Sequence, residues 1–259
     1  MNTRVLVTGA GGQLGKTIAE RFTENTNNLD FIFATSKDLD ITKKQDVLDF
    51  FRKNNFDYCI NCAAYTNVEQ AEKTPMIAFE VNAEGVKNIA EACKETNSIL
   101  IHVSTDYVFD GEKTTPYIVT DEPNPINEYG KSKLKGENYI KETLEKYFIV
   151  RTSWLYSKKY GKNFYKTILE KSKTEQELSI IDSQTGCPTN TVNLADYLFK
   201  LIQNNHFGIH HFTDKKAMTW YDFAKKILTD NNKLEDIKLV KANNYRTFAT
   251  RPKNSVLAN

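Results

Sequence analysis

The stretch Val5-Leu6-Val7-Thr8-Gly9-Ala10-Gly11-Gly12-Gln13-Leu14-Gly15 decides how this chain folds. An apolar, β-branched run precedes the glycines, and residues 16–23 after them place Ile18, Ala19 and Phe22 at helical intervals. Glycines between a strand and a helix permit a tight turn and let the backbone approach a pyrophosphate at the positive end of the helix. The spacing is Gly-x-x-Gly-x-x-Gly, which departs from Gly-x-Gly-x-x-Gly. Its place in the chain nevertheless predicts a dinucleotide site that includes Gly9, Gly12 and Gly15.

Further strands and helices alternate after this first unit. We expect strands at 31–34, 58–64 and 99–103, and helices at 43–53, capped by Thr42, and at 76–96. This alternation predicts an α/β fold, with a Rossmann-type doubly wound parallel sheet in a dinucleotide-binding domain over residues 1–155. Beyond it the alternation loosens, with helices expected at 163–173, 192–203 and 220–228 and strands at 178–181 and 208–212. Residues 156–259 are therefore expected to form mainly a smaller mixed α/β lobe that binds substrate.

The end of the second expected strand bears on the choice of cofactor. Thr35-Ser36-Lys37 stands where an acidic residue would hold the ribose 2′-hydroxyl of NADH and a basic one would accommodate the 2′-phosphate of NADPH. We therefore favour NADPH, contacted by Ser36 and Lys37. NADH is the alternative, in which Lys37 is a solvated loop residue.

The segment Tyr129-Gly130-Lys131-Ser132-Lys133 carries the chemistry that we expect. Residues four apart on a helix lie one above the other, so Tyr129 and Lys133 are expected to face one cleft. A nearby ammonium group favours phenolate, which predicts a lowered pKa for Tyr129 and a role as general acid. The alternative is an aromatic ring packed under a snorkelling lysine. Ser104 and Thr105 follow the fourth strand, and ligands bind beyond the carboxyl ends of such strands, so their hydroxyls are expected at the same site. Asn82, within an otherwise packed helix, fits a structural or a catalytic role equally.

Composition narrows the class of protein. The chain has 259 residues and a formal net charge of +2, which gives no electrostatic reason to expect nucleic acid or a membrane surface as partner. No run approaches the ~18 apolar residues of a spanning helix, and a strand follows Met1 too closely for a signal peptide, so we expect a cytoplasmic protein. The Cys59-x-x-Cys62 spacing lies in an apolar strand and is expected to bury small side chains. The four histidines lack metal-ligand spacing, and no metal site is predicted.

Together these residues resemble the extended short-chain dehydrogenase/reductase family, which pairs a Thr-Gly-x-x-Gly-x-x-Gly loop with a Ser or Thr and a Tyr-x-x-x-Lys. The likeness narrows to the dTDP-4-dehydrorhamnose reductase branch and covers essentially the whole chain. The segments that carry it are Asn61-Cys62-Ala63-Ala64-Tyr65-Thr66, Ser104-Thr105-Asp106-Tyr107-Val108-Phe109-Asp110-Gly111, Arg151-Thr152-Ser153-Trp154-Leu155-Tyr156, Asp182-x-Gln184-x-Gly186-x-Pro188-Thr189 and Arg251-Pro252-x-Asn254-Ser255.

The resemblance implies roles for individual residues. The implied catalytic set is Thr105, Tyr129 and Lys133. The implied cofactor site adds to Tyr129, Lys133 and the glycine turn the residues Gln13, Leu14, Asp40, Ile41, Ala63, Ala64 and Tyr65. The implied contacts to a nucleotide-sugar substrate are Thr105, Asp106, Tyr107 and Trp154.

The activity that the resemblance implies is NADPH-dependent reduction of the C4 ketone of dTDP-4-dehydro-L-rhamnose to dTDP-L-rhamnose, in nucleotide-sugar biosynthesis. The alternatives are reduction of another nucleotide-linked 4-keto sugar, and a non-catalytic regulatory subunit of the methionine adenosyltransferase beta type. The resembled sequences continue past Arg251-Pro252 into a helical tail that in some supports a metal-assisted dimer contact. This chain is expected to be shortened there, and a homodimer is left open.

Overall fold

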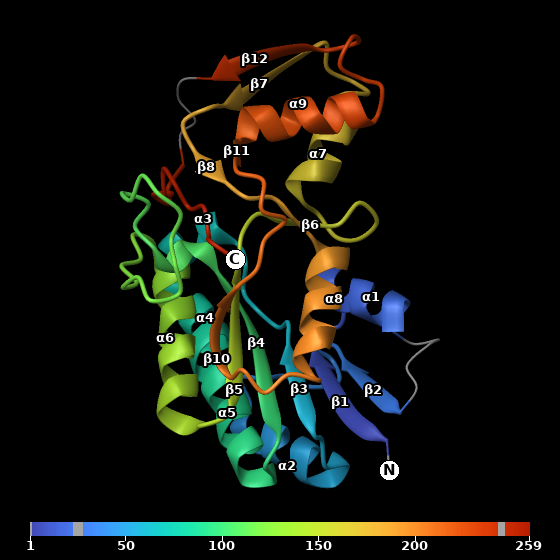
Figure 1. The fold of residues 1–259 in the computed structure, drawn as a ribbon, viewed down its shortest axis with the longest axis vertical. Coiled ribbons are helices and arrows are strands. Elements are labelled where there is room, and N and C mark those ends of the chain that lie inside the picture. The colour runs from blue at the N-terminus through green and yellow to red at the C-terminus, as the bar shows by residue number, and fades with distance from the viewer. Residues whose placement is uncertain (1, 23–27, 243–246) are drawn as a thin grey trace.

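The computed structural model describes residues 2–22, 28–242 and 247–259. Within these ranges, six parallel strands form the central sheet in the order β10-β5-β4-β3-β1-β2 (Figure 1). They are β1 (Thr3–Thr8), β2 (Leu29–Ala34), β3 (Tyr58–Asn61), β4 (Ile99–Thr105), β5 (Tyr147–Thr152) and β10 (Gly208–His211). The predicted doubly wound parallel sheet is thereby confirmed. β1 lies between β2 and β3, so the order of strands reverses there, and such a switch point is where open α/β sheets bind ligands.

Helices cover both faces of this sheet. α1 (Gln13–Phe22) and α8 (Thr191–Leu201) lie on one face, in a core that includes Ile18 and Leu198. α2 (Lys44–Asn54), α5 (Gly85–Thr96) and α6 (Glu128–Thr143) lie on the other, in a core that includes Phe51 and Ile89. The helices contribute apolar side chains at helical intervals to both cores, which is why the sequence pattern located these helices.

Some element boundaries differ from the sequence expectations. The predicted Thr42 cap is wrong, because Lys43 is the N-cap residue of α2 and the Thr42 hydroxyl donates a hydrogen bond to Asp40 Oδ1 at 2.8 Å. β3 ends at Asn61, three residues before the expected end. The helix expected at 76–96 is a run of α4 (Pro75–Phe79), the π-helical turn η1 (Glu80–Glu84) and α5. Thr23, the expected end of the first helix, lies outside the described residues.

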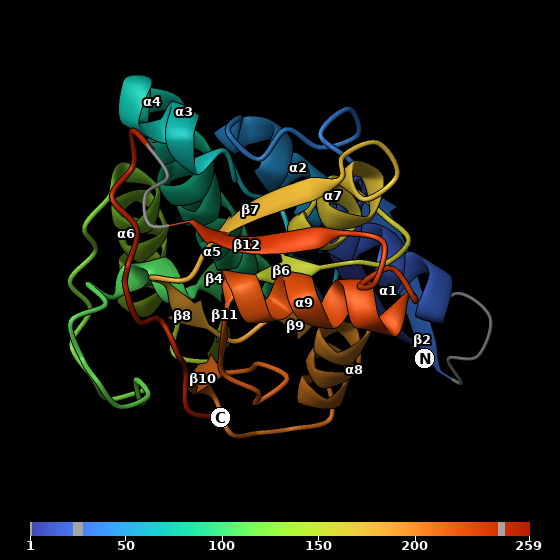
Figure 2. The same cartoon turned by 90° about the horizontal axis from the view of Figure 1, so that it is seen from above.

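A smaller lobe lies beyond the carboxyl ends of the strands (Figure 1). Its helices are α7 (Phe164–Lys171) and α9 (Trp220–Asp230), which share a core around Ile168 and Phe223 with the parallel pair β7 (Glu177–Ile181) and β12 (Lys238–Ala242). Figure 2 shows α9 beside this pair from above. The short pairs β6 (Leu155–Tyr156) with β9 (Thr189–Asn190), and β8 (Thr185–Gly186) with β11 (Met218–Thr219), complete the lobe. Between these segments the chain returns to the main sheet through α8 and β10.

In the part of the chain that the structure describes, no helix combines the length and the apolar character needed to cross a bilayer.

Candidate active site

A cleft of about 560 Å³ lies between the carboxyl ends of the strands and the smaller lobe. Thirteen of the residues predicted from the sequence line it: Gly9, Gly12, Gln13, Leu14, Gly15, Ala64, Ser104, Thr105, Asp106, Tyr107, Tyr129, Lys133 and Trp154. A second cavity of about 320 Å³ adjoins it at the glycine turn, and its lining includes the predicted residues Ser36, Asp40, Ile41 and Ala63. Lys37 and Tyr65 line neither cavity. The fold thus gathers segments that lie far apart in the sequence at one edge of the sheet.

At the start of α1, the glycines of the turn leave the backbone without covering side chains. Gly9 has φ +64°, and a Cβ there would lie 2.6 Å from the Ala63 nitrogen. A Cβ on Gly15 would lie 2.6 Å from the Ala10 Cα, so neither position accepts a side chain. Amide groups at the N-terminus of a helix form a site for anions. A glycine turn at the N-terminus of α1 is therefore suited to bind the pyrophosphate of a dinucleotide through its backbone amides.

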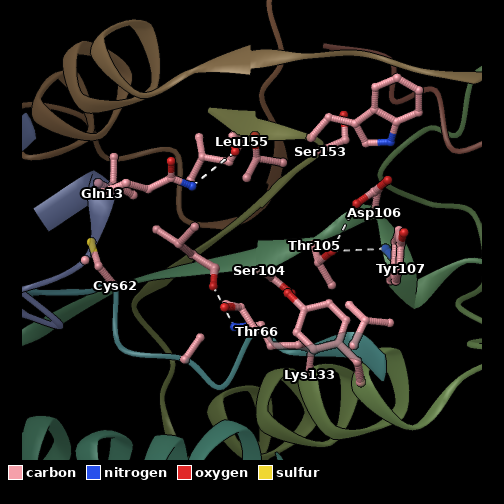
Figure 3. A pocket seen from close by; sticks show the side chains of 18 of the residues that line it. Gln13, Cys62, Thr66, Ser104, Thr105, Asp106, Tyr107, Lys133, Ser153 and Leu155 are labelled. Carbon is pink, nitrogen blue, oxygen red and sulfur yellow. Dashed lines mark hydrogen bonds between the residues drawn. The ribbon is translucent and has the colours of Figure 1, made fainter. Parts of the chain in front are cut away.

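The Gln13 side chain joins α1 to the smaller lobe. Its amide nitrogen donates to the Leu155 carbonyl at 3.1 Å, as Figure 3 shows, and its oxygen accepts from the Ser157 amide at 3.2 Å and from Asn163 Nδ2 at 3.0 Å. These contacts place Gln13 at the wall of the cleft and leave its amide already engaged.

The second cavity begins where β2 ends. Ser36 and Lys37 are exposed, and Asp38 accepts hydrogen bonds from the Thr35 hydroxyl at 2.6 Å and the Thr35 amide at 2.9 Å. These bonds lower the pKa of Asp38. The Asp38 carboxylate is therefore held against Thr35 of its own loop, and Ser36 lines the cavity.

Thr105 and Asp106 stand at the end of β4. The Thr105 hydroxyl donates to Asp106 Oδ1 at 3.0 Å and accepts from the Tyr107 amide at 3.2 Å (Figure 3). Burial raises the pKa of Asp106 to about 6, although hydrogen bonds with Ser255 and Thr105 lower it. The Tyr107 ring meets the Tyr129 ring edge to face, with 5.8 Å between centroids. Two hydroxyl-bearing side chains, Thr105 and Tyr129, thus face the cleft together.

Tyr129 is in the first turn of α6, whose N-cap residue Asn127 accepts from the Gly130 amide at 2.8 Å. Burial raises the pKa of Tyr129 to about 12, and a hydrogen bond with Thr105 only partly offsets this. The expected lowering of this pKa is therefore wrong. The physical reason is that Lys133 Nζ turns to the sheet, where it donates to the Val103 carbonyl at 2.8 Å and lies 3.3 Å from His102 Nε2. A protonated phenol is nevertheless the form that a general acid requires.

Lys133 is a buried cation, with 1% of its surface exposed. Burial lowers its pKa to about 8, while the Glu137 carboxylate raises it. The lysine is therefore placed under the cleft wall, within α6 and against β4, instead of snorkelling to solvent.

Asn82 sits in the π-helical turn and is fully buried. Its Oδ1 accepts from the Tyr65 amide at 2.8 Å, and its Nδ2 donates to the Tyr65 carbonyl at 3.0 Å and to Ser132 Oγ at 3.0 Å. It ties the loop after β3 to α6, and it does not line the cleft. These contacts favour a structural role for Asn82 over a catalytic one.

Trp154 is held in an unusual backbone conformation, with φ +46°. Its indole stacks on Trp220 of α9, with centroids 3.5 Å apart and planes 5° from parallel. A Cβ on Gly186 would lie 2.5 Å from Trp154 Cε2, so only glycine leaves room for the ring. Left-handed backbone at a non-glycine residue costs roughly 1–3 kcal/mol and is found at functional sites. Both rings pack against the core of the smaller lobe and line the cleft.

Several residues of the cleft were not assigned from the sequence. They include Thr66, Ser153, Lys162, Trp220 and Arg251. Arg251 pairs with Glu69 at 2.7 Å, and it stands in the Arg251-Pro252 segment that the resemblance had already singled out. Trp220 gave no signal beyond the periodicity of α9, because its partner Trp154 is distant in the sequence.

Known proteins resemble this chain in both sequence and architecture. The model of the RmlD substrate binding domain family matches residues 3–259. A dTDP-4-dehydrorhamnose reductase of Aggregatibacter actinomycetemcomitans is 40% identical over 269 residues, which cover 98% of this chain and 90% of the relative. A crystal structure of a dTDP-4-dehydrorhamnose reductase from Clostridium acetobutylicum is similar at TM-score 0.95 and 41% identity, over 99% of this chain and 90% of that one.

A further structure, the dTDP-4-dehydrorhamnose reductase of Bacillus anthracis in complex with NADP, is similar at TM-score 0.95 and 40% identity. The alignment covers 100% of this chain and 91% of that one. Since the family model, the sequence identity and the fold agree over nearly every residue, the chain belongs to the dTDP-4-dehydrorhamnose reductase family.

Proposed function

We propose that this chain reduces the C4 ketone of dTDP-4-dehydro-L-rhamnose to dTDP-L-rhamnose with NADPH. The observation that carries the proposal is that Tyr129 and Thr105 line one cleft together with the glycine turn, where burial raises the pKa of the Tyr129 phenol to about 12. Family membership supports the substrate, and the bare turn at Gly9 supports the dinucleotide.

The cofactor site is proposed to extend over both cavities. The backbone from Gly9 to Gly15 receives the pyrophosphate, and Ala63 and Ala64 form a flat wall beside it. Ser36 and Lys37, at the outer end, meet the 2′-phosphate. Bound NADPH supplies the hydride for the ketone carbon.

The proton is proposed to come from Tyr129. As the ketone oxygen gains negative charge, the Thr105 hydroxyl turns its one proton from Asp106 Oδ1 to that oxygen, and the Tyr129 phenol transfers its proton to it. The product is an alcohol, and the charge remains as phenolate on Tyr129. Lys133, one helical turn away in the same cleft, is proposed to contact the nicotinamide ribose of the cofactor through its ammonium group.

The substrate's remaining contacts are proposed to be Asp106, Tyr107 and Trp154. Asp106 can accept hydrogen bonds from sugar hydroxyls, and the aromatic rings offer flat apolar faces to the sugar or base. The homodimer and the cytoplasmic location expected from the sequence stay predictions.

The test is loss of absorbance at 340 nm when the purified chain meets NADPH and dTDP-4-dehydro-L-rhamnose. Tyr129→Phe is expected to lower kcat by roughly 10²–10⁴-fold, because the general acid is removed. Tyr139→Phe is the matched control, because Tyr139 lies on the same helix but donates to exposed Glu84 at 2.8 Å. This control is expected to keep full activity.

Three outcomes separate the alternatives. Turnover that Tyr129→Phe abolishes supports the proposal. Faster turnover of another nucleotide-linked 4-keto sugar would replace the substrate and keep the reaction. Tight NADPH binding without turnover of any such sugar would contradict the reductase and favour the regulatory-subunit alternative.

A further inference from the structure

Glu137 continues the stripe that begins with Tyr129 and Lys133. The three residues are four apart on α6, so their side chains lie on one face of the helix, toward β4. Glu137 is 0% exposed. A carboxylate is rarely buried without a partner, so its position calls for a reason.

Its contacts attach α6 to two strands of the sheet. Glu137 Oε1 accepts from Ser104 Oγ at 2.6 Å and from Arg151 Nε at 3.0 Å, and Oε2 accepts from Arg151 Nη2 at 2.7 Å. Ser104 precedes Thr105 on β4, and Arg151 is on β5. One turn earlier, Lys133 donates to the Val103 carbonyl. The two attachments hold α6 in register with β4, and thereby set Tyr129 opposite Thr105.

The charges around Lys133 leave Glu137 as its anionic neighbour. On β4, burial holds the pKa of His102 well below its ordinary value, so the imidazole is neutral. After β3, burial raises the pKa of the Cys62 thiol to about 12, so it too is neutral. On α6 itself, the Tyr129 phenol is protonated.

Two further charged groups lie nearby. Arg151 on β5 is a second buried cation, 1% exposed, with its guanidinium carbon 5.1 Å from the centre of the Phe109 ring. Asp106 is a buried carboxylate, but its hydrogen bonds are with Thr105 and Ser255, and its charge acts on Tyr129. Glu137 pairs with Arg151 at 2.7 Å, and its charge also raises the pKa of Lys133. Without Glu137, this part of the described structure would hold two buried cations, Lys133 and Arg151, and would lose the carboxylate that offsets them.

We propose that Glu137 is a positioning residue for the proposed ketone reduction: it fixes α6 against β4 and keeps Lys133 an ammonium ion beneath the cleft. Arg151 is part of the same arrangement. It binds the Glu137 carboxylate in a bidentate contact and partly neutralises the negative charge that acts on Lys133. Removal of the Glu137 charge should therefore lower the pKa of Lys133, and removal of the Arg151 charge should raise it.

The test compares pH profiles of kcat/KM for the full chain and its variants. The parent is expected to lose activity on the alkaline side as Lys133 loses its proton, near its pKa of about 8. Glu137→Gln preserves the size of the side chain and removes its charge, so the alkaline fall in kcat/KM is expected to shift to lower pH by about 1 unit. The loss would then be roughly tenfold at pH 9 and within about twofold at pH 6. Arg151→Met is expected to shift this fall to higher pH.

The matched control is Glu84→Gln, which removes an exposed carboxylate that contacts α6 through Tyr139, and it is expected to leave the profile unchanged. A purely structural role of Glu137 would lower activity equally at every pH, and that result overturns the proposal. An alkaline limb that stays in place in Glu137→Gln overturns it as well.

A second readout needs no turnover, because the proposal rests on the reductase function and the two must fail separately. The dissociation constant of NADPH, followed by nicotinamide fluorescence at pH 6 and pH 9, should rise with pH about tenfold more in Glu137→Gln than in the parent. A parent without turnover refutes the function alone. Equal pH dependence of binding in parent and variant refutes the role of Glu137.

Discussion

Replacing Gly136 by alanine tests how closely α6 must approach the π-helical turn. A Cβ built on Gly136 would lie 2.2 Å from the carbonyl oxygen of Asn82 and 3.4 Å from Val86 Cβ. Intrinsic helix propensity alone predicts that Gly136→Ala stabilises the chain by about 1 kcal/mol. The contact predicts the reverse, since the atom struck is backbone and must retreat by roughly 1 Å to reach van der Waals distance.

The expected loss in free energy of unfolding depends on the hydrogen bonds that hold Asn82 in place. Asn82 makes three hydrogen bonds, two with the Tyr65 backbone and one with Ser132, and each is worth about 1 kcal/mol. Overpacking adds roughly 1–3 kcal/mol. If part of the hydrogen bonding survives, the net loss in free energy of unfolding is about 2 kcal/mol after the gain in propensity. For a chain of this size, that corresponds to a Tm lower by about 4–8 °C.

Thermal unfolding followed by circular dichroism measures this change. Gly11→Ala is the control, because the nearest atom to a Cβ there is Thr35 Cγ2 at 3.9 Å, and its Tm is expected to stay within about 2 °C of the parent. A Tm for Gly136→Ala equal to or above that of the parent would refute the reasoning, and would mean that α6 and the turn separate freely.

Two other substitutions probe a cleft residue, Asp106, and a residue of the loop after β2, Lys37. Burial raises the pKa of Asp106 from its usual 3.8 to about 6, and a carboxyl with a raised folded-state pKa destabilises the fold increasingly as pH rises from about 4 to 6 and fully above that. Asp106→Asn should therefore raise the free energy of unfolding at pH 7.5 by up to about 3 kcal/mol and lower kcat/KM, whereas an equal effect at pH 4 would contradict the assignment. Lys37→Ala should weaken NADPH binding by about tenfold and leave NADH binding unchanged, because only NADPH carries the 2′-phosphate. Titrations with both cofactors check this, and equal losses would remove Lys37 from the site.

The sequence predicted what depends on short-range pattern. The turn from Gly9 to Gly15, the alternation of strands and helices and the helix around Tyr129 all followed from periodicity and glycine placement, and the fold is as predicted. The gathering of Thr105, Tyr129 and the glycines at one edge also followed, because the carboxyl ends of parallel strands must meet there.

What the sequence could not give depends on contacts between distant segments. The direction of the pKa shift of Tyr129 was predicted wrongly, since helical spacing alone does not reveal burial or the turn of Lys133 toward Val103. Glu137 reads as an ordinary helix residue until Arg151 of β5 lies against it. Trp220 likewise becomes part of the cleft only through its stack on Trp154.

That stack has a consequence for spectroscopy. The chain contains two tryptophans, and they are the stacked pair, so all its indole emission comes from the side of the smaller lobe that lines the cleft. In a denaturant titration, tryptophan fluorescence would report the unfolding of the smaller lobe, whereas the central sheet contributes no tryptophan emission. A lower midpoint by tryptophan fluorescence than by circular dichroism would then reveal an intermediate in which the smaller lobe is unfolded and the parallel sheet is intact.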